Sequence, residues 1–147
     1  MHQSSYWLSL TCRCCLSTSK HDTHHIFLCS SSEIIKKREE IYLDLENFIY
    51  LESPDHNLSL ILTSIFTNSP LPYVPSHLRP LMYSLHKFGH QNLWHGILPQ
   101  SLCNLIFSFG HNGNRWVQQL IRRLLNLNNE LWRYRCTIIH AKLLSHE

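Results

Sequence analysis

Four residues near the N-terminus have the types and the spacing of a zinc site. Two cysteines are separated by two residues, and a histidine and a further cysteine follow with three residues between them. Two thiolates so close together can bind one ion from a tight turn, and the second pair can lie on one face of a helical turn. Together they would complete the closed tetrahedral coordination of a structural zinc ion. The predicted ligands of this one ion are Cys12, Cys15, His25 and Cys29.

The ligand register and the oxidation state of the cysteines leave alternatives open. Cys14 and His24 are adjacent to the chosen ligands and can replace them. The first ten residues lack the basic start and the sustained apolar stretch of a secretory signal, so we expect an intracellular protein, in the cytoplasm or the nucleus. In those compartments the six cysteines are interpreted as thiols or metal ligands before disulfides. The simplest alternative to a zinc site is a set of free thiols.

The same segment resembles a known family. The string over 12–29, in which a Cys pair precedes an Asp-Thr pair (22–23), a His and a final Cys, is similar to the zinc-binding segment that follows the reverse-transcriptase domain in many non-LTR retroelement polyproteins. The end of the chain resembles the tail of these reading frames, in which a Trp-containing helix precedes the motif Leu-Trp-x2-Arg-x4-His. The matching residues are Leu131, Trp132, Arg135 and His140. Cys136 replaces the usual Asn of that motif, and Ala141 replaces the usual Gly.

This resemblance implies a zinc-binding helical tail with weak nucleic-acid binding and without polymerase chemistry. A polymerase needs paired carboxylates that hold two Mg²⁺ ions. The nearest string, IYLDLE at 41–46, contains a lone Asp44 that we interpret as a solvated mid-helix carboxylate. We therefore expect a non-catalytic fragment, assign no catalytic residue, and expect RNA or single-stranded DNA as its partner.

Arginines in the C-terminal half form the predicted nucleic-acid surface. Guanidinium groups can bind phosphates, and exposed aromatic rings such as that of Trp132 can stack on unpaired bases. Phe27, in the zinc segment, is a second candidate for stacking on a base. The alternative is that the arginines form an ordinary solvated helix face. The predicted set is Arg115, Arg122, Arg123 and Arg133.

Arg135 and His140 allow a second interpretation, because an Arg-x4-His motif also resembles that of the HEPN-type ribonucleases, which are all-α. The His would act as general base on the RNA 2′-hydroxyl, and the Arg would stabilise the phosphorane. Five residues apart, the two side chains lie about 140° apart around a straight helix, so a kink or a dimer would be needed. The simpler interpretation is a surface Arg and a His near the helix C-terminus. A third alternative is a helical interaction protein that binds no metal.

The elements that position these residues are predicted to be helices, so the fold class is all-α behind a small zinc-knuckle-like segment. The scarcity of Gly and of alternating apolar runs argues against a large sheet. We expect Ser31 or Ser32 to cap the first helix, and Asp55 to cap the second. Apolar residues at helical spacing predict helices over 33–52, 57–67, 79–93 and 99–109. The predicted buried residues of the first two are Ile34, Ile41, Leu45, Phe48 and Leu51, then Leu58, Ile61, Leu62, Ile65 and Phe66.

A long final helix is predicted from Arg115 onward. The string GHNGN at 110–114 is typical of a loop before it, and the Asn-rich 126–129 predicts an interruption within it. Its predicted apolar stripe consists of Trp116, Leu120, Leu124, Leu127, Leu131, Tyr134, Ile138 and Ala141.

Charge and proline divide the chain near its middle. Residues 1–69 contain 5 Lys/Arg and 8 Asp/Glu, and residues 70–147 contain 8 and 2, so net charges of −3 and +6 give the total of +3. Prolines between them predict a turn-rich linker near 69–80. We predict a zinc-knuckle-like segment over 1–30 and a helical domain over 31–147. No apolar run approaches the roughly 20 residues that span a bilayer, so no membrane partner is expected.

Overall fold

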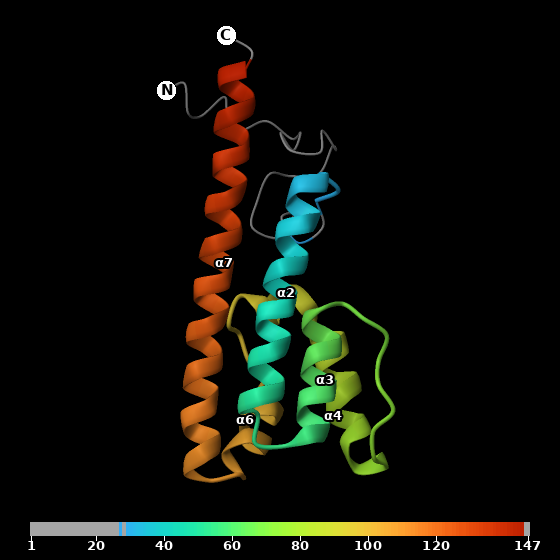
Figure 1. Cartoon of the computed structure of the whole chain (residues 1–147). Coiled ribbons are helices and arrows are strands. Elements are labelled where there is room, and N and C mark those ends of the chain that lie inside the picture. Colours follow the sequence, from blue (N-terminus) through green and yellow to red (C-terminus); the bar gives the residue numbers. More distant parts are fainter. Residues whose placement is uncertain (1–26, 28, 146–147) are drawn as a thin grey trace. The chain divides into compact units, whose positions relative to one another are not determined.

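The computed structural model describes Phe27 and residues 29–145, and this part of the chain is built from helices without a strand, as the sequence predicts. No helix within it combines the length and the apolar character that crossing a membrane requires. The elements, shown in Figure 1, are α2 (Ser32–Glu52), α3 (His56–Phe66), the 3₁₀ helix η2 (Ser76–Leu78), α4 (Arg79–Phe88), α5 (His90–Trp94), α6 (Gln100–Phe107) and α7 (His111–Ser145).

The chain divides into two compact units. Unit 1 combines Met1–Ile41 with Asn129–Glu147, and unit 2 is the continuous segment Tyr42–Asn128. Both borders fall inside helices, so α2 and α7 each contribute to the two units. The predicted border after residue 30 separates a segment that lies almost wholly outside the described residues, and it stays a prediction.

Within unit 2, α3 forms as predicted and is fully packed. The Asp55 backbone is extended, and its carboxylate accepts the Leu58 backbone N–H at 2.9 Å, which makes Asp55 the N-cap. The five predicted apolar residues of this helix are all buried. In the proline-rich segment that follows, residues 69–75 have no helix, whereas residues 76–80 of the predicted linker lie in η2 and α4. The linker near 69–80 therefore stays a prediction.

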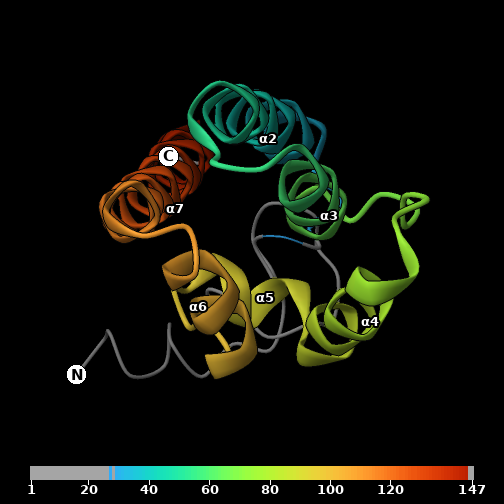
Figure 2. The ribbon, with the colours of Figure 1, turned by 90° about the horizontal axis from the view of Figure 1, so that it is seen from below.

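The core of unit 2 is organised around Trp94, whose side chain is completely buried. Its indole N–H donates to the backbone carbonyl of Phe66 at 2.8 Å, and the two rings meet edge to face with centroids 5.6 Å apart. The side-chain amide of Asn128 donates to the Trp94 carbonyl. Helix α5, which carries Trp94, lies between α4 and α6 (Figure 2). This residue thus ties α5 to both α3 and the unit 2 part of α7.

The prediction of one continuous helix over 79–93 is wrong, because the structure has two helices there. Gly89 has φ of 109°, which lies outside the helical region and is accessible to glycine, so α4 ends before it and α5 begins after it. The chain changes direction at this residue instead of continuing as one helix.

The predicted loop at 110–114 is also wrong, because α7 already begins at His111. Only Gly110 has the left-handed backbone of a turn, with φ of 79°. Gly113 is helical and lies against the preceding helix, where a Cβ atom would come within 2.0 Å of the Ile106 carbonyl oxygen. The glycine is therefore needed for a close approach of two helices and not for a loop.

The interior of α7 differs from the prediction in two ways. The helix runs through 126–129 without the predicted interruption. In its unit 1 part the buried residues follow steps of four, at Leu131, Arg135 and Ile139, whereas Ala141 is exposed and the remaining predicted stripe residues, Tyr134 and Ile138, are half-buried. A similar shift occurs in α2, where Ile49 is buried and the predicted Leu51 is 82% exposed.

Candidate functional site

The predicted zinc ligands lie almost entirely outside the described residues. This holds for Cys12, Cys15 and His25, and for the alternatives Cys14 and His24. Cys29 is described and is 2% exposed, immediately before α2. Within the described residues, no group of three or more His, Cys, Asp or Glu side chains is placed to hold a metal ion.

The structure does not bring Arg135 and His140 together. His140 is exposed, whereas Arg135 is 4% exposed and its guanidinium carbon lies 4.4 Å from the centroid of the Trp132 ring. The interpretation of Arg135 as a surface residue is therefore wrong. Its Nη2 atom has no hydrogen-bond partner in the described part of the chain, which is costly for a buried cation. Stacking on Trp132 compensates part of this cost through the ring face.

Lys37, in unit 1, forms ion pairs with two carboxylates, one of them on α7. Its ammonium lies 2.7 Å from a Glu130 carboxylate oxygen and 3.6 Å from one of Glu40, and 5.6 Å from the centroid of the Tyr134 ring. The hydrogen bond to Glu130 is the main reason that the pKa of Lys37 is raised. At the start of α2, the Ser31 hydroxyl donates to Glu33 at 2.7 Å and lowers the pKa of that carboxyl. These contacts hold the fold and place no reactive group.

The predicted nucleic-acid arginines are divided by the structure. Arg123 pairs with Asp44 at 2.9 Å, and its guanidinium carbon lies 4.9 Å from the centroid of the Phe48 ring. Its charge is therefore used inside unit 2, and Asp44 is an ion-pair partner and not simply a solvated carboxylate. Arg133 is exposed and belongs to unit 1.

Arg115 and Arg122 remain as a pair of unit 2 cations. Both are exposed, and neither forms an ion pair in the described part of the chain. Seven residues are almost two helical turns, so the two side chains project from the same face of α7, about 10 Å apart along its axis. Residues 111–128 contain no Asp or Glu. The geometry can therefore bind an anion that extends along the helix.

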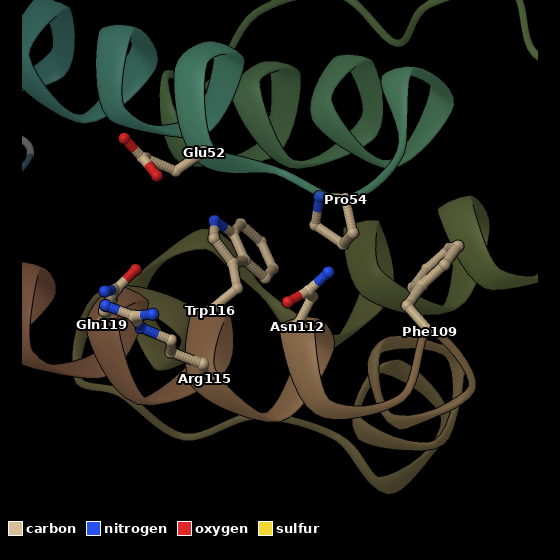
Figure 3. Close-up of a pocket in the computed structure, with 7 residues that line it drawn as sticks. All are labelled: Glu52, Pro54, Phe109, Asn112, Arg115, Trp116 and Gln119. Carbon is tan, nitrogen blue, oxygen red and sulfur yellow. The ribbon is translucent and has the colours of Figure 1, made fainter.

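Arg115 also lines a pocket that the sequence does not predict. The pocket measures about 500 Å³ and lies within unit 2. Figure 3 shows that one wall comes from Glu52, the last residue of α2, and from Pro54, two residues beyond it, and that the opposite wall comes from α7 and the turn before it. Polar groups gather toward one end and apolar groups toward the other. The lining residues are Glu52, Pro54, Phe109, Asn112, Arg115, Trp116 and Gln119.

Trp116 is the buried floor of this pocket. It is 2% exposed, and its ring is stacked on Phe48 with centroids 6.4 Å apart and planes 5° apart. The indole nitrogen is buried and has no hydrogen-bond partner among the residues that the structure describes. In Figure 3 the ring edge that carries this nitrogen faces the wall formed by Glu52. A buried donor without an acceptor costs about 1–3 kcal/mol, so this atom favours a ligand that supplies an acceptor.

Sequence reasoning missed the pocket because its walls are about sixty residues apart in the chain. Glu52 ends a helix, and the pattern at 110–114 assigns Asn112 to a loop, so neither residue carries a signal of its own. The spacing of Asn112, Arg115, Trp116 and Gln119, in successive steps of three, one and three, places them on one side of a helix only if α7 begins at His111.

No protein-family model matches this chain, and neither a curated protein nor a solved structure is similar to it.

Proposed function

We propose that this chain is a non-catalytic fragment of the kind found downstream of a retroelement reverse transcriptase, and that it binds single-stranded nucleic acid through α7. The observation that carries the proposal is the pair Arg115 and Arg122, which are exposed on one helix face and have no acidic partner among the described residues. The binding surface is the unit 2 part of that face, which we call the α7 basic face: Arg115, Arg122 and the exposed Asn126.

The composition of the α7 basic face suits a phosphate backbone. Asn126 lies four residues beyond Arg122 and is exposed, so its amide continues the same face as a neutral hydrogen-bonding group. Each cation that contacts a phosphate releases condensed counterions, which favours binding at low salt. Asp44 does not oppose this attraction, because its charge is compensated by Arg123 at 2.9 Å.

The few phosphate contacts of the α7 basic face imply a weak affinity, and phosphate contacts by themselves do not depend on the base sequence. Two or three phosphate contacts correspond to the range of non-specific binding, with Kd of about 10⁻⁴–10⁻⁶ M at physiological salt. The resemblance supports the same partner, because the tail of a reverse transcriptase works on nucleic acid. The second part of the proposal is one zinc ion held by Cys12, Cys15, His25 and Cys29, which would supply structural cross-linking of the N-terminal segment.

The experiment is a salt titration in which the purified chain of 147 residues binds a fluorescein-labelled 20-nucleotide oligo(U) RNA, and binding is measured by fluorescence anisotropy. The slope of log K against log[salt] is about −0.7 per phosphate contact on a single strand. The double variant Arg115→Gln/Arg122→Gln should reduce the magnitude of this slope by about 1.4 and weaken binding at low salt. Metal analysis of the same preparation should find about one zinc per chain, and Cys15→Ser should reduce it.

The matched control is Arg79→Gln/Lys87→Gln. Both residues are exposed on α4 in the same unit, so the control removes the same two charges from another surface. Its slope should equal that of the unaltered chain. An equal decrease in the two double variants would mean that net charge alone drives binding, and the proposed α7 basic face would be wrong. The absence of measurable binding to oligo(U) at low salt would also show that the proposed α7 basic face is wrong.

A further inference from the structure

We infer that the pocket beside the α7 basic face accepts an unstacked guanine base. This inference rests on the proposed function, since it names the base that a bound single strand would insert, and Arg115 belongs to both sites. The pocket's volume of about 500 Å³ falls within the roughly 300–1,000 Å³ of small-ligand sites.

The polar end of the pocket contains a hydrogen-bond acceptor, the Glu52 carboxylate, and a donor, the Trp116 indole N–H, between which no hydrogen bond is present in the described part of the chain. Glu52 contributes a carboxylate, which accepts hydrogen bonds only, and it forms no ion pair with Arg115 in the described part of the chain. Trp116 contributes a buried indole N–H without a partner, on the ring edge that faces Glu52 (Figure 3). A ligand that suits this end must present donors and an acceptor side by side.

Guanine is the nucleobase with that pattern. Its Watson–Crick edge presents two adjacent donors, N1–H and the 2-amino group, next to the O6 acceptor. A carboxylate can accept both donors at once, and a neighbouring N–H can donate to O6. Adenine and cytosine place a ring nitrogen lone pair beside their single amino group, which a carboxylate repels. Uracil offers one donor between two acceptors.

The rest of the pocket suits the ring and the phosphate. Phe109 and Pro54 line the other end from opposite walls (Figure 3), and an aromatic face can stack on a base. Asn112 lies between the two ends and has both a donor and an acceptor for the base. Arg115 is exposed at the pocket rim, where it can contact the phosphate next to the inserted base. Glu52 is exposed as well, so its side chain can turn to admit the base.

The experiment compares three oligo(U) strands in which one central residue is guanosine, inosine or adenosine, by the same anisotropy assay at constant salt. Inosine lacks the 2-amino group and therefore one of the two hydrogen bonds to the carboxylate. The unaltered chain should bind the guanosine strand at least about fivefold more tightly than the others, the lower limit for a bidentate base contact. Glu52→Gln should abolish the preference. Glu46→Gln, on the same helix and unit but not at the pocket, should keep it.

Comparing strands within each variant cancels the change in overall charge. Trp116→Phe, which keeps a ring on Phe48 and removes the donor, should lower the guanosine preference while binding to plain oligo(U) persists. Equal binding of guanosine and inosine strands by the unaltered chain would refute the inference, as would a preference that survives Glu52→Gln or disappears in Glu46→Gln.

Equilibrium dialysis with GMP and IMP separates this inference from the proposed function. A GMP preference that depends on Glu52, without binding to any strand, would support the pocket and refute the proposed function. Binding of oligo(U) through the α7 basic face, with no base preference and no GMP binding, would leave the proposed function intact and refute the pocket.

Discussion

Replacing Gly113 by Ala gives a test in which local propensity and tertiary packing predict opposite signs. Gly113 lies in the first turn of α7, and alanine is favoured over glycine in a helix by about 1 kcal/mol. The same change lowers the entropy of the unfolded chain, which also favours the folded state. Considered as a helical position alone, Gly113→Ala should stabilise the protein.

The contacts around Gly113 predict the reverse. A Cβ atom would lie 2.0 Å from the Ile106 carbonyl oxygen, 3.1 Å from its carbonyl carbon and 3.3 Å from the Phe109 Cβ. The obstacle is backbone, so α6 and α7 would have to separate by more than 1 Å to reach ordinary contact. Overpacking of this kind costs about 1–3 kcal/mol, and we take the upper end because a carbonyl cannot rotate away. Subtracting the propensity gain leaves a net loss of about 2 kcal/mol.

The assay is urea unfolding of the full chain at 25 °C, followed by far-UV circular dichroism, with thermal unfolding beside it. For a chain of this size about 2 kcal/mol corresponds to a decrease in Tm of about 8 °C. Asn114→Ala is the matched control, because Asn114 is exposed in the same turn and the change should be neutral or stabilising by about 0.5 kcal/mol. If Gly113→Ala is as stable as the unaltered chain, the close approach of the two helices is not real.

Two further predictions concern caps and pH. Asp55→Ala removes the carboxylate that accepts the Leu58 N–H at 2.9 Å and should lower the free energy of unfolding by about 1 kcal/mol in the same assay. Asp55→Asn keeps a capping oxygen and should lose much less stability. Equal losses of stability in both variants would show that the cap hydrogen bond contributes nothing. The pKa of Glu33 is lowered chiefly by the Ser31 hydroxyl, so its stabilising effect is present above the unfolded pKa of about 4.3 and disappears as the pH falls through the lower folded pKa. Ser31→Ala should therefore reduce the loss of stability on acidification, measured as the Tm between pH 6 and pH 2, and parallel pH profiles for the two proteins would contradict this.

Local signals were sufficient for the helices whose ends are set by their own residues. Asp55 and the apolar spacing behind it predict α3, because capping and periodicity depend on contacts within about four residues. Local signals failed at glycine, which is common both in loops and where two helices pack closely. Gly113 lies in a string that is typical of a loop, yet its role is to let α7 lie against the Ile106 carbonyl.

The candidate site shows the same division. The all-α fold, the position of the basic half and the helical spacing of the arginines on the last helix follow from the sequence alone. Which of those arginines is paired with a carboxylate depends on the tertiary structure, because the pair of Arg123 and Asp44 joins residues 79 positions apart. The tertiary structure also decided that Glu52 and Trp116 line one pocket. Contacts between distant segments depend on how helices pack, and that packing is a property of the whole core, which no window of the sequence contains.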